Sequence, residues 1–257
     1  MTIHHTPISQ FKRSIFSAPL AGGHEVTHDI YSRGSGAPVV LIQELPGIGQ
    51  ETLRLADRLV DAGFEVVMPH LFGPIGRTSM AGNLTRVLCM RKEFSLFSAN
   101  KSSPIVDWLK ALCNDVRESR SVPGVGVIGM CLTGNFAISL IGDDSVLAAV
   151  ASQPAMPLHK QDALHMSPAD LSKSRRALDE KGPMLGFRFR NDKACTARKF
   201  DCIRDAFNDD GKQRIKLETL PGKGHSVLTI DFVDEEGHPT VKALDSVIDY
   251  FNQNLTP

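Results

Sequence analysis

Apolar runs alternate with amphipathic stretches along most of the chain. Runs rich in apolar and β-branched residues, typical of buried parallel strands, fall at 39–44, 64–71, 125–130, 146–152, 184–189 and 215–220. Stretches with apolar residues at helical spacing lie at 51–62, 84–97, 104–118, 132–141, 167–181, 196–207 and 240–254. Strands that alternate with helices predict an α/β fold, with a mostly parallel central sheet covered by helices on both faces.

The N-terminal region has a different pattern. Residues 25–32 alternate between polar and β-branched or apolar positions, which predicts a strand before the turn at Gly34. Residues 1–23 lack such a pattern and are expected to form an irregular arm without a secretory signal. No repeat, linker or change of composition divides the remainder, so we expect residues 1–257 to form a single domain.

Composition and charge narrow the classes of partner. Apolar residues make up 42% and charged residues 23% of the 257 positions, as is usual for globular proteins. The formal net charge of +0 gives no reason to expect nucleic acid or a membrane surface as partner. Five cysteines, an odd number without a C-x-x-C pair, predict a reducing, cytoplasmic location rather than a disulfide framework.

Residues at the carboxyl ends of the predicted strands are candidates for chemistry, because active sites of open parallel sheets lie there. The strand 125–130 leads into Cys131 and then a helix, which is the arrangement of a G-x-S-x-G elbow with cysteine as the nucleophile. A helix N-terminus favours the thiolate, and the backbone amide of Leu132 is placed to bind an oxyanion. The alternative interpretation of Cys131 is a buried structural thiol.

Three further strand ends carry polar residues. Glu44 ends the apolar run 39–44, and the amide of Leu45 that follows is the natural second oxyanion donor. Asp192 follows the strand 184–189, and His225 follows the last strand. Nucleophile, acid and histidine thus occur in the order that α/β hydrolases use, each in the expected loop.

With these residues in place, the sequence resembles the dienelactone hydrolase family of the α/β-hydrolase superfamily. The resemblance covers about residues 39–251 and rests on Gln43-Glu44, on Gly129-Met130-Cys131-Leu132, on Asp192 and on Gly224-His225-Ser226. It implies a hydrolase of esters or lactones that works through an acyl-enzyme intermediate and needs neither a metal nor another cofactor. A small-molecule ester or lactone would be the partner, and the chain would be a monomer or a small homo-oligomer.

The resemblance also implies a role for each residue. Cys131 would be the nucleophile, His225 the base and Asp192 the residue that orients it. Glu44 would contact the thiol and help to ionise it when substrate binds. The backbone amides of Leu45 and Leu132 would form the oxyanion hole.

Two departures from the family pattern bear on substrate. Thr133 stands where the family usually has a small residue, and the arginine that follows the catalytic histidine in founding members is missing after His225. Arg188 and Arg190 share a strand face with Asp192 and are candidate replacements for binding an anionic substrate, with Arg91 a weaker one. Residues 231–238 have the composition of an added loop near the site.

Two other functions remain as alternatives. One is a hydrolase fold that binds ligands without catalysis. The other is a zinc hydrolase that uses His24-Glu25-Val26-Thr27-His28, a literal H-E-x-x-H motif. That motif needs a helix, whereas the β-branched residues here favour a strand, on which the two histidines lie roughly 13 Å apart.

Overall fold

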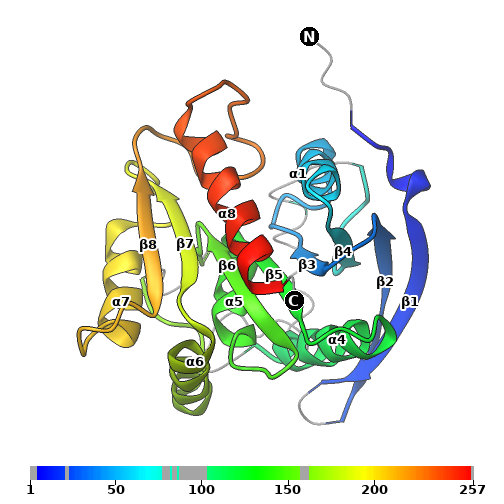
Figure 1. The fold of residues 1–257 in the computed structure, drawn as a ribbon, viewed down its shortest axis with the longest axis horizontal. Coiled ribbons are helices and arrows are strands. Elements are labelled where there is room, and N and C mark those ends of the chain that lie inside the picture. Colours follow the sequence, from blue (N-terminus) through cyan, green and yellow to red (C-terminus); the bar gives the residue numbers. More distant parts are fainter. Residues whose placement is uncertain are drawn as a thin grey trace.

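The computed structural model describes residues 5–20, 23–76, 82, 86, 103–156 and 162–255. Within these ranges one eight-stranded sheet has the order β1-β2-β4-β3-β5-β6-β7-β8 (Figure 1). The strands are β1 (Lys12–Pro19), β2 (Glu25–Arg33), β3 (Pro38–Ile42), β4 (Glu65–His70), β5 (Val125–Met130), β6 (Val146–Ser152), β7 (Met184–Phe189) and β8 (Ile215–Leu220). The pairs β1–β2 and β2–β4 are antiparallel, and the other neighbours are parallel.

Helices cover both faces of this sheet. They are α1 (Gln50–Asp61), α4 (Ile105–Ser119), α5 (Gly134–Leu140), α6 (Pro168–Lys181), α7 (Ala197–Phe207) and α8 (Pro239–Leu255). Along β3, Val40 and Ile42 pack with α4 to α7, whereas Val39 and Leu41 pack with α1 and α8. Successive side chains of a strand point to opposite faces, so a strand buried on both sides has a continuous apolar sequence. No helix in the described ranges is both long and apolar enough to cross a membrane.

The predicted α/β fold is confirmed. Four strands have the predicted bounds, those at 125–130, 146–152, 184–189 and 215–220. Of the helix predicted at 84–97, the structure describes residue 86 alone, which is helical. The irregular arm predicted for residues 1–23 is wrong, because Lys12–Pro19 pair antiparallel with β2 as the edge strand β1. Only Ala18 of β1 is fully buried, so the strand is held by backbone pairing and its sequence shows no clear alternation.

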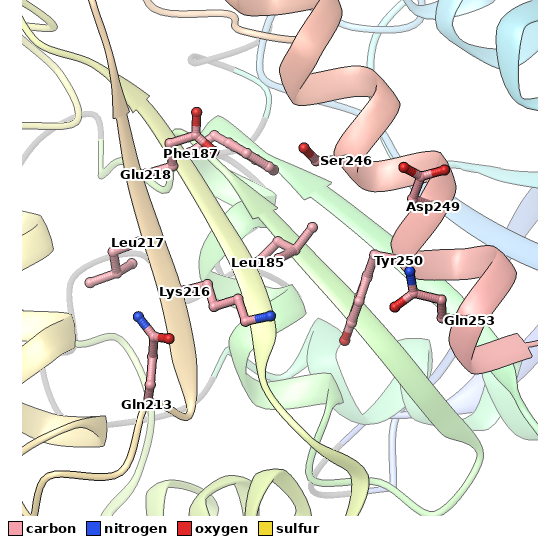
Figure 2. Close-up of a pocket in the computed structure, with 10 residues that line it drawn as sticks. All are labelled: Leu185, Phe187, Gln213, Lys216, Leu217, Glu218, Ser246, Asp249, Tyr250 and Gln253. Atoms are coloured by element: carbon pink, nitrogen blue, oxygen red, sulfur yellow. The ribbon is translucent and has the colours of Figure 1, made fainter.

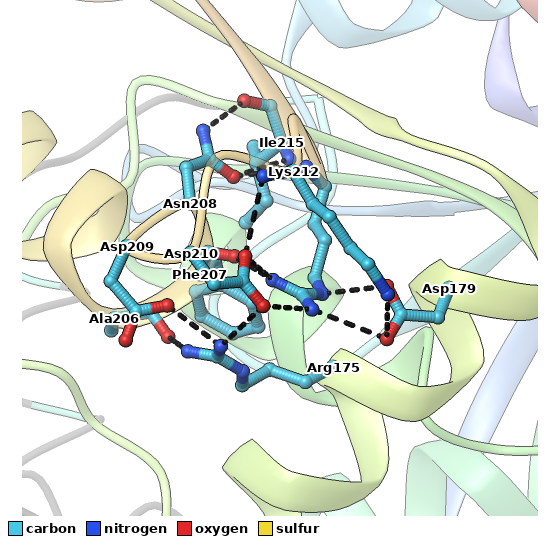
Figure 3. A network of polar contacts seen from close by, with 10 residues as sticks. Arg175, Asp179, Ala206, Phe207, Asn208, Asp209, Asp210, Lys212 and Ile215 are labelled. Carbon is cyan, nitrogen blue, oxygen red and sulfur yellow. Dashed lines mark hydrogen bonds and ion pairs between the residues drawn. The ribbon is translucent and has the colours of Figure 1, made fainter.

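A buried arginine joins the elements at the β8 edge of the sheet, and its partners Asp179, Phe207 and Asp210 are labelled in Figure 3. Arg214, whose side chain is 5% exposed, forms ion pairs with Asp210 at 2.7 Å and with Asp179 at 2.9 Å. It also donates to the backbone carbonyl of Phe207. These contacts connect α6, the end of α7 and the start of β8. They therefore help to fix β7 and β8, whose carboxyl ends lead to Asp192 and His225.

Candidate active site

A sharp turn at the end of β5 presents Cys131. Its φ of 56° lies in the left-handed region that side chains other than glycine rarely adopt. The turn needs small neighbours, because a Cβ on Gly129 would lie 2.2 Å from the backbone oxygen of Thr133. A Cβ on Gly134 would lie 3.0 Å from Cα of Pro154. The backbone strain at a single buried cysteine is the feature expected of a nucleophile elbow.

Thr133 adds hydrogen bonds to this turn and does not distort it. Its hydroxyl accepts from the backbone N–H of Met130 at 2.9 Å. The carbonyl oxygens of Met130, at 3.0 Å, and of Ile42, at 3.3 Å, are both within reach of the hydroxyl proton. Because Ile42 ends β3, Thr133 connects the elbow to the strand that leads to Glu44. The larger residue at this position is thus accommodated by polar contacts.

His225 and Asp192 form the pair predicted from their places in the sequence. Nδ1 of His225 lies 2.8 Å from Oδ2 of Asp192, and the carboxylate side chain is only 1% exposed. The other oxygen of Asp192 accepts from the backbone N–H groups of Ala194 and Cys195 at 2.8 and 3.0 Å. The loop after β7 therefore fixes the carboxylate, which in turn fixes the imidazole.

The second nitrogen of the imidazole, Nε2, is not engaged by Asp192, and His225 also interacts with Cys131. Nε2 of His225 is buried and makes no hydrogen bond to any described residue. Burial by itself lowers the pKa of His225. The contacts with Asp192 and Cys131 outweigh that effect and raise the pKa to about 10. Three residues that are distant in the sequence are thus coupled in one site.

Glu44 lies in the same site but contacts a different segment. Its side chain is buried, and its Oε2 accepts from Oγ of Ser226 at 2.8 Å. Its Oε1 accepts from the hydroxyl of Thr229. Burial raises the pKa of Glu44, while these two hydroxyls and His225 oppose the rise. Neither carboxylate oxygen forms a hydrogen bond with Cys131, in contrast to the contact that the family resemblance implies.

The sequence interpretation missed two residues that support the histidine loop. Oδ2 of Asp231 accepts from the backbone N–H groups of His225 at 2.7 Å and Ser226 at 2.9 Å. Gln153, buried at the end of β6 with a φ of 37°, accepts from the N–H of Val227 at 3.3 Å. The sequence places Asp231 only in an added loop, and no motif marks Gln153. Their roles depend on the path of the loop, which local sequence does not specify.

The structure buries both predicted oxyanion donors and one of the three predicted arginines. Leu45 and Leu132 are buried directly after Glu44 and Cys131. The guanidinium of Arg188 is also buried, and it donates to the carbonyls of Cys195 and Arg190 at 2.9 and 3.0 Å. It is thus bound to the loop that carries Asp192. Arg190 is exposed, and Arg91 lies outside the described residues.

The H-E-x-x-H segment forms no helix. Glu25 to His28 belong to β2, and the ring of His28 packs edge-on against Trp108 with the ring centroids 5.0 Å apart. The strand expected there is confirmed, so the two histidines do not share a helix face as that zinc motif requires. In the described ranges no three His, Cys, Asp or Glu side chains are grouped as metal ligands.

Two pockets help to locate the site. One, of about 480 Å³, adjoins the acid–base pair and is lined by residues that include Asp192, His225 and Asp231. The other, of about 460 Å³, lies between α8 and the strands β7 and β8 (Figure 2). It is lined by residues such as Phe187 and Tyr250 and by none of the predicted site residues. Of these two pockets, only the first is lined by predicted site residues.

Comparisons with known proteins bear on the family and on the fold. The sequence model of the dienelactone hydrolase family matches residues 30–255. No curated protein matches the chain. A dienelactone hydrolase-like promiscuous phosphotriesterase from metagenomic libraries has a similar structure, with a TM-score of 0.62 and 14% identity. The match covers 95% of this chain and 99% of that one.

Two esterases have similar structures as well. A cold-adapted esterase from an Arctic intertidal metagenomic library gives a TM-score of 0.60 at 16% identity, covering 99% of this chain and 100% of that one. An esterase of Pyrococcus furiosus gives a TM-score of 0.56 at 15% identity, covering 100% of this chain and 98% of the other. At these identities the structures support the fold.

Proposed function

Because this chain belongs to the dienelactone hydrolase family and is a hydrolase acting on esters, we propose that it cleaves ester or lactone bonds through a Cys131–His225–Asp192 triad. The observation that carries the proposal is the 2.8 Å contact between His225 and Asp192, with the free Nε2 of the imidazole coupled to Cys131 at a strained turn. A nucleophile, its base and the group that orients the base are then all present.

In the first half of the reaction, Nε2 of His225 takes the proton of the Cys131 thiol, and the sulfur attacks the carbonyl carbon of the ester. The π electrons move to the carbonyl oxygen, and the backbone amides of Leu45 and Leu132 stabilise that oxyanion. A single oxyanion donor is worth about 3 kcal/mol in a related case. As the tetrahedral intermediate collapses, the alcohol leaves with a proton from Nε2 of His225, and a thioester on Cys131 remains.

In the second half, neutral His225 takes a proton from water, and the hydroxide formed attacks the thioester. Collapse of the second intermediate releases the carboxylic acid and the sulfur of Cys131, and His225 returns its proton to that sulfur. A thiolate is a better leaving group than an amine and a worse one than an activated alkoxide. Activated esters, enol esters and lactones therefore suit this nucleophile better than amides do.

Residues around the pocket suggest which esters bind. Arg190 is exposed immediately before the loop that lines the pocket, so we assign it as the contact for anionic substrates. Arg188 is assigned to support of that loop, because its guanidinium is already bound to two backbone carbonyls. No step requires a cofactor. The odd number of cysteines and the lack of a C-x-x-C pair support a cytoplasmic location.

The test is p-nitrophenyl acetate hydrolysis by the wild type and the Cys131→Ala variant. We expect the Ala variant to lose activity by a factor on the order of 10³ or more, as removal of a triad nucleophile does elsewhere. Cys202→Ala is the matched control, because Cys202 is a half-buried free cysteine on α7, and it should keep full activity. Iodoacetamide labelling with peptide mass analysis should identify Cys131 as the residue whose alkylation abolishes activity.

Two results would contradict the proposal. Full activity in Cys131→Ala would exclude a cysteine nucleophile. A wild type that hydrolyses none of a panel of activated esters and lactones, and that no acylating probe labels, would instead favour a fold that binds ligands without catalysis.

A further inference from the structure

The strand β8 forms one edge of the sheet, with β7 as its neighbour on the inner side. The backbone carbonyl of Arg214, just before β8, accepts from the N–H of Met184 in β7 at 3.0 Å. The backbone groups of the next residue, Ile215, point the other way and bind the side chain of Asn208. The N–H of Ile215 donates to Oδ1 at 3.1 Å, and its carbonyl accepts from Nδ2 at 2.9 Å. A side chain of this chain thus covers the outer side of β8 at its first residue.

Farther along β8 the outer side is open. Backbone groups of alternate residues in a strand point to the same side, so the N–H and C=O of Leu217 and Thr219 have the direction of those of Ile215. Thr219 is exposed and Leu217 is partly exposed. No side chain in the described ranges binds these four groups as Asn208 binds Ile215. Open N–H and C=O groups on a sheet edge are a template for another strand.

The side chains of β8 favour a second copy of the same strand as the partner. Lys216 and Glu218 are exposed and line the groove between α8 and the strands β7 and β8 (Figure 2). Neither forms an ion pair with any residue in the described ranges. In an antiparallel copy with Leu217 opposite Leu217, Lys216 of each strand lies opposite Glu218 of the other. Opposite charges at such positions stabilise a strand pair, whereas like charges destabilise it.

The other edge of the sheet lacks this complementarity. β1 carries Lys12 and Arg13 and no acidic residue. Two antiparallel copies of β1 would bring no carboxylate of the strand to either cation, and charges of one sign protect an edge from pairing. Self-complementary charge is therefore a property of β8 and not of both edges.

We propose that β8 pairs antiparallel with β8 of a second copy about a two-fold axis at Leu217, so that two eight-stranded sheets join in a homodimer. The interface is isologous, and the pair of Lys216 with Glu218 occurs twice in it. Because the axis is perpendicular to the joined sheet, both α8 helices lie on the same face and the two grooves adjoin. The interface contains no residue of the proposed triad, so its existence does not depend on the proposed reaction.

The first experiment is sedimentation velocity of the full chain over a series of concentrations. A six-residue edge gives a small interface, so we expect a dimer with a Kd on the order of 10 µM at low ionic strength. Salt should raise this Kd, because it screens exposed charge pairs. Lys216→Glu or Glu218→Lys alone places like charges opposite each other twice and should raise the Kd about tenfold or more. The double variant Lys216→Glu with Glu218→Lys restores opposite charges and should restore the wild-type Kd.

The second experiment tests the register by disulfide formation between Lys216→Cys and Glu218→Cys variants. An equimolar mixture should give a cross-linked dimer under mild oxidation, because residues directly opposite at these positions have Cα atoms about 4.5 Å apart. Peptide mass analysis should assign the link to positions 216 and 218. Each variant alone should form no such link, because identical positions are then about 7–8 Å apart, too far for an unstrained disulfide.

Urea denaturation of every variant is the control for folding, and the midpoints should equal that of the wild type because both side chains are exposed. If a charge reversal lowers the midpoint, Lys216→Gln and Glu218→Gln remove one charge without adding its opposite and should still raise the Kd. A wild type that stays monomeric up to about 1 mM, far above the Kd expected for a weak interface, overturns the proposal. So does a dimer that neither charge change weakens, or a Glu218→Cys variant that cross-links by itself.

Discussion

At the scale of single residues, Asp231 fixes the backbone around His225, the proposed catalytic base. One oxygen, Oδ2, accepts the N–H groups of both His225 and Ser226. Gly224 fits this arrangement, because its φ is 134° and a Cβ there would lie 2.8 Å from Cγ of Asp231. The same carboxylate therefore determines the direction of His225 and of a hydroxyl donor to Glu44.

Asp231→Ala should lower kcat for p-nitrophenyl acetate on the order of 10- to 100-fold, because a catalytic base displaced by about 1 Å loses rate on that scale. KM should change less, since the backbone of the pocket keeps its other contacts. Asp231→Asn is the matched variant: its carbonyl oxygen can accept the same two N–H groups, so it should keep most of the activity. Equal losses in the two variants would show that the negative charge matters and that backbone positioning does not.

Residue types at strand ends predicted Cys131, Asp192 and His225, which the structure brings together. The sequence could not predict the partners of Glu44, because Ser226 and Thr229 are more than 180 positions away and reach it only through the path of the loop. The same holds for Arg188, whose burial follows from the fold of the loop after β7. The local sequence pattern identifies candidate reactive residues, whereas long-range packing determines which residues they contact.

At the scale of elements, the junction of β3, β5 and the elbow depends on the hydroxyl of Thr133. It accepts the N–H of Met130 and lies within hydrogen-bonding distance of the carbonyl of Ile42. Thr133→Val preserves shape but leaves that buried N–H without its acceptor. Such a loss costs about 1–3 kcal/mol of the free energy of unfolding. Urea denaturation should show this decrease, together with lower esterase activity.

Thr133→Ser retains the hydroxyl and should lose less than half as much stability as the Val variant. A Val variant as stable as the wild type would mean that the hydroxyl contacts contribute nothing, and that the elbow is held by its glycines alone.

Elements differ in how well their sequence predicts them. β5, β6 and β7 are almost entirely buried, and their bounds follow from apolar runs between turn residues. β1 was missed because an edge strand makes its contacts through backbone pairing, and seven of its eight residues remain at least partly exposed. The pattern of apolar residues reflects which side chains are buried, so a strand with few buried side chains is hard to predict from that pattern.

At the scale of the whole molecule, the core between the sheet and the layer of α4 to α7 buries two thiols whose titration limits stability in alkali. Cys113 on α4 and Cys195 before α7 are both fully buried, and burial raises the pKa of each thiol. In the unfolded chain these thiols ionise near pH 8.5. Their protonated form is thus favoured by folding, so this contribution is complete below about pH 8.5 and is lost as the pH rises above it.

Each thiol should therefore reduce the free energy of unfolding by about 1.4 kcal/mol per pH unit above pH 8.5, or about 3 kcal/mol by pH 10.5. Cys113→Ala and Cys195→Ala each remove one titrating thiol, so the free energy of unfolding of each variant should fall less steeply with pH than that of the wild type, by the contribution of one thiol. The cavity that each substitution leaves lowers stability by an amount that does not depend on pH. Urea denaturation from pH 8 to 10.5 under reducing conditions measures the difference from the wild type. Cys202→Ala, at the half-buried free cysteine, is the control.

The contribution of His225, whose pKa is about 10, has the same sign but cancels, because all the variants contain it. A Cys113→Ala slope equal to that of the wild type would show that the α4 layer opens to solvent before the chain unfolds, since only an accessible thiol titrates without this penalty.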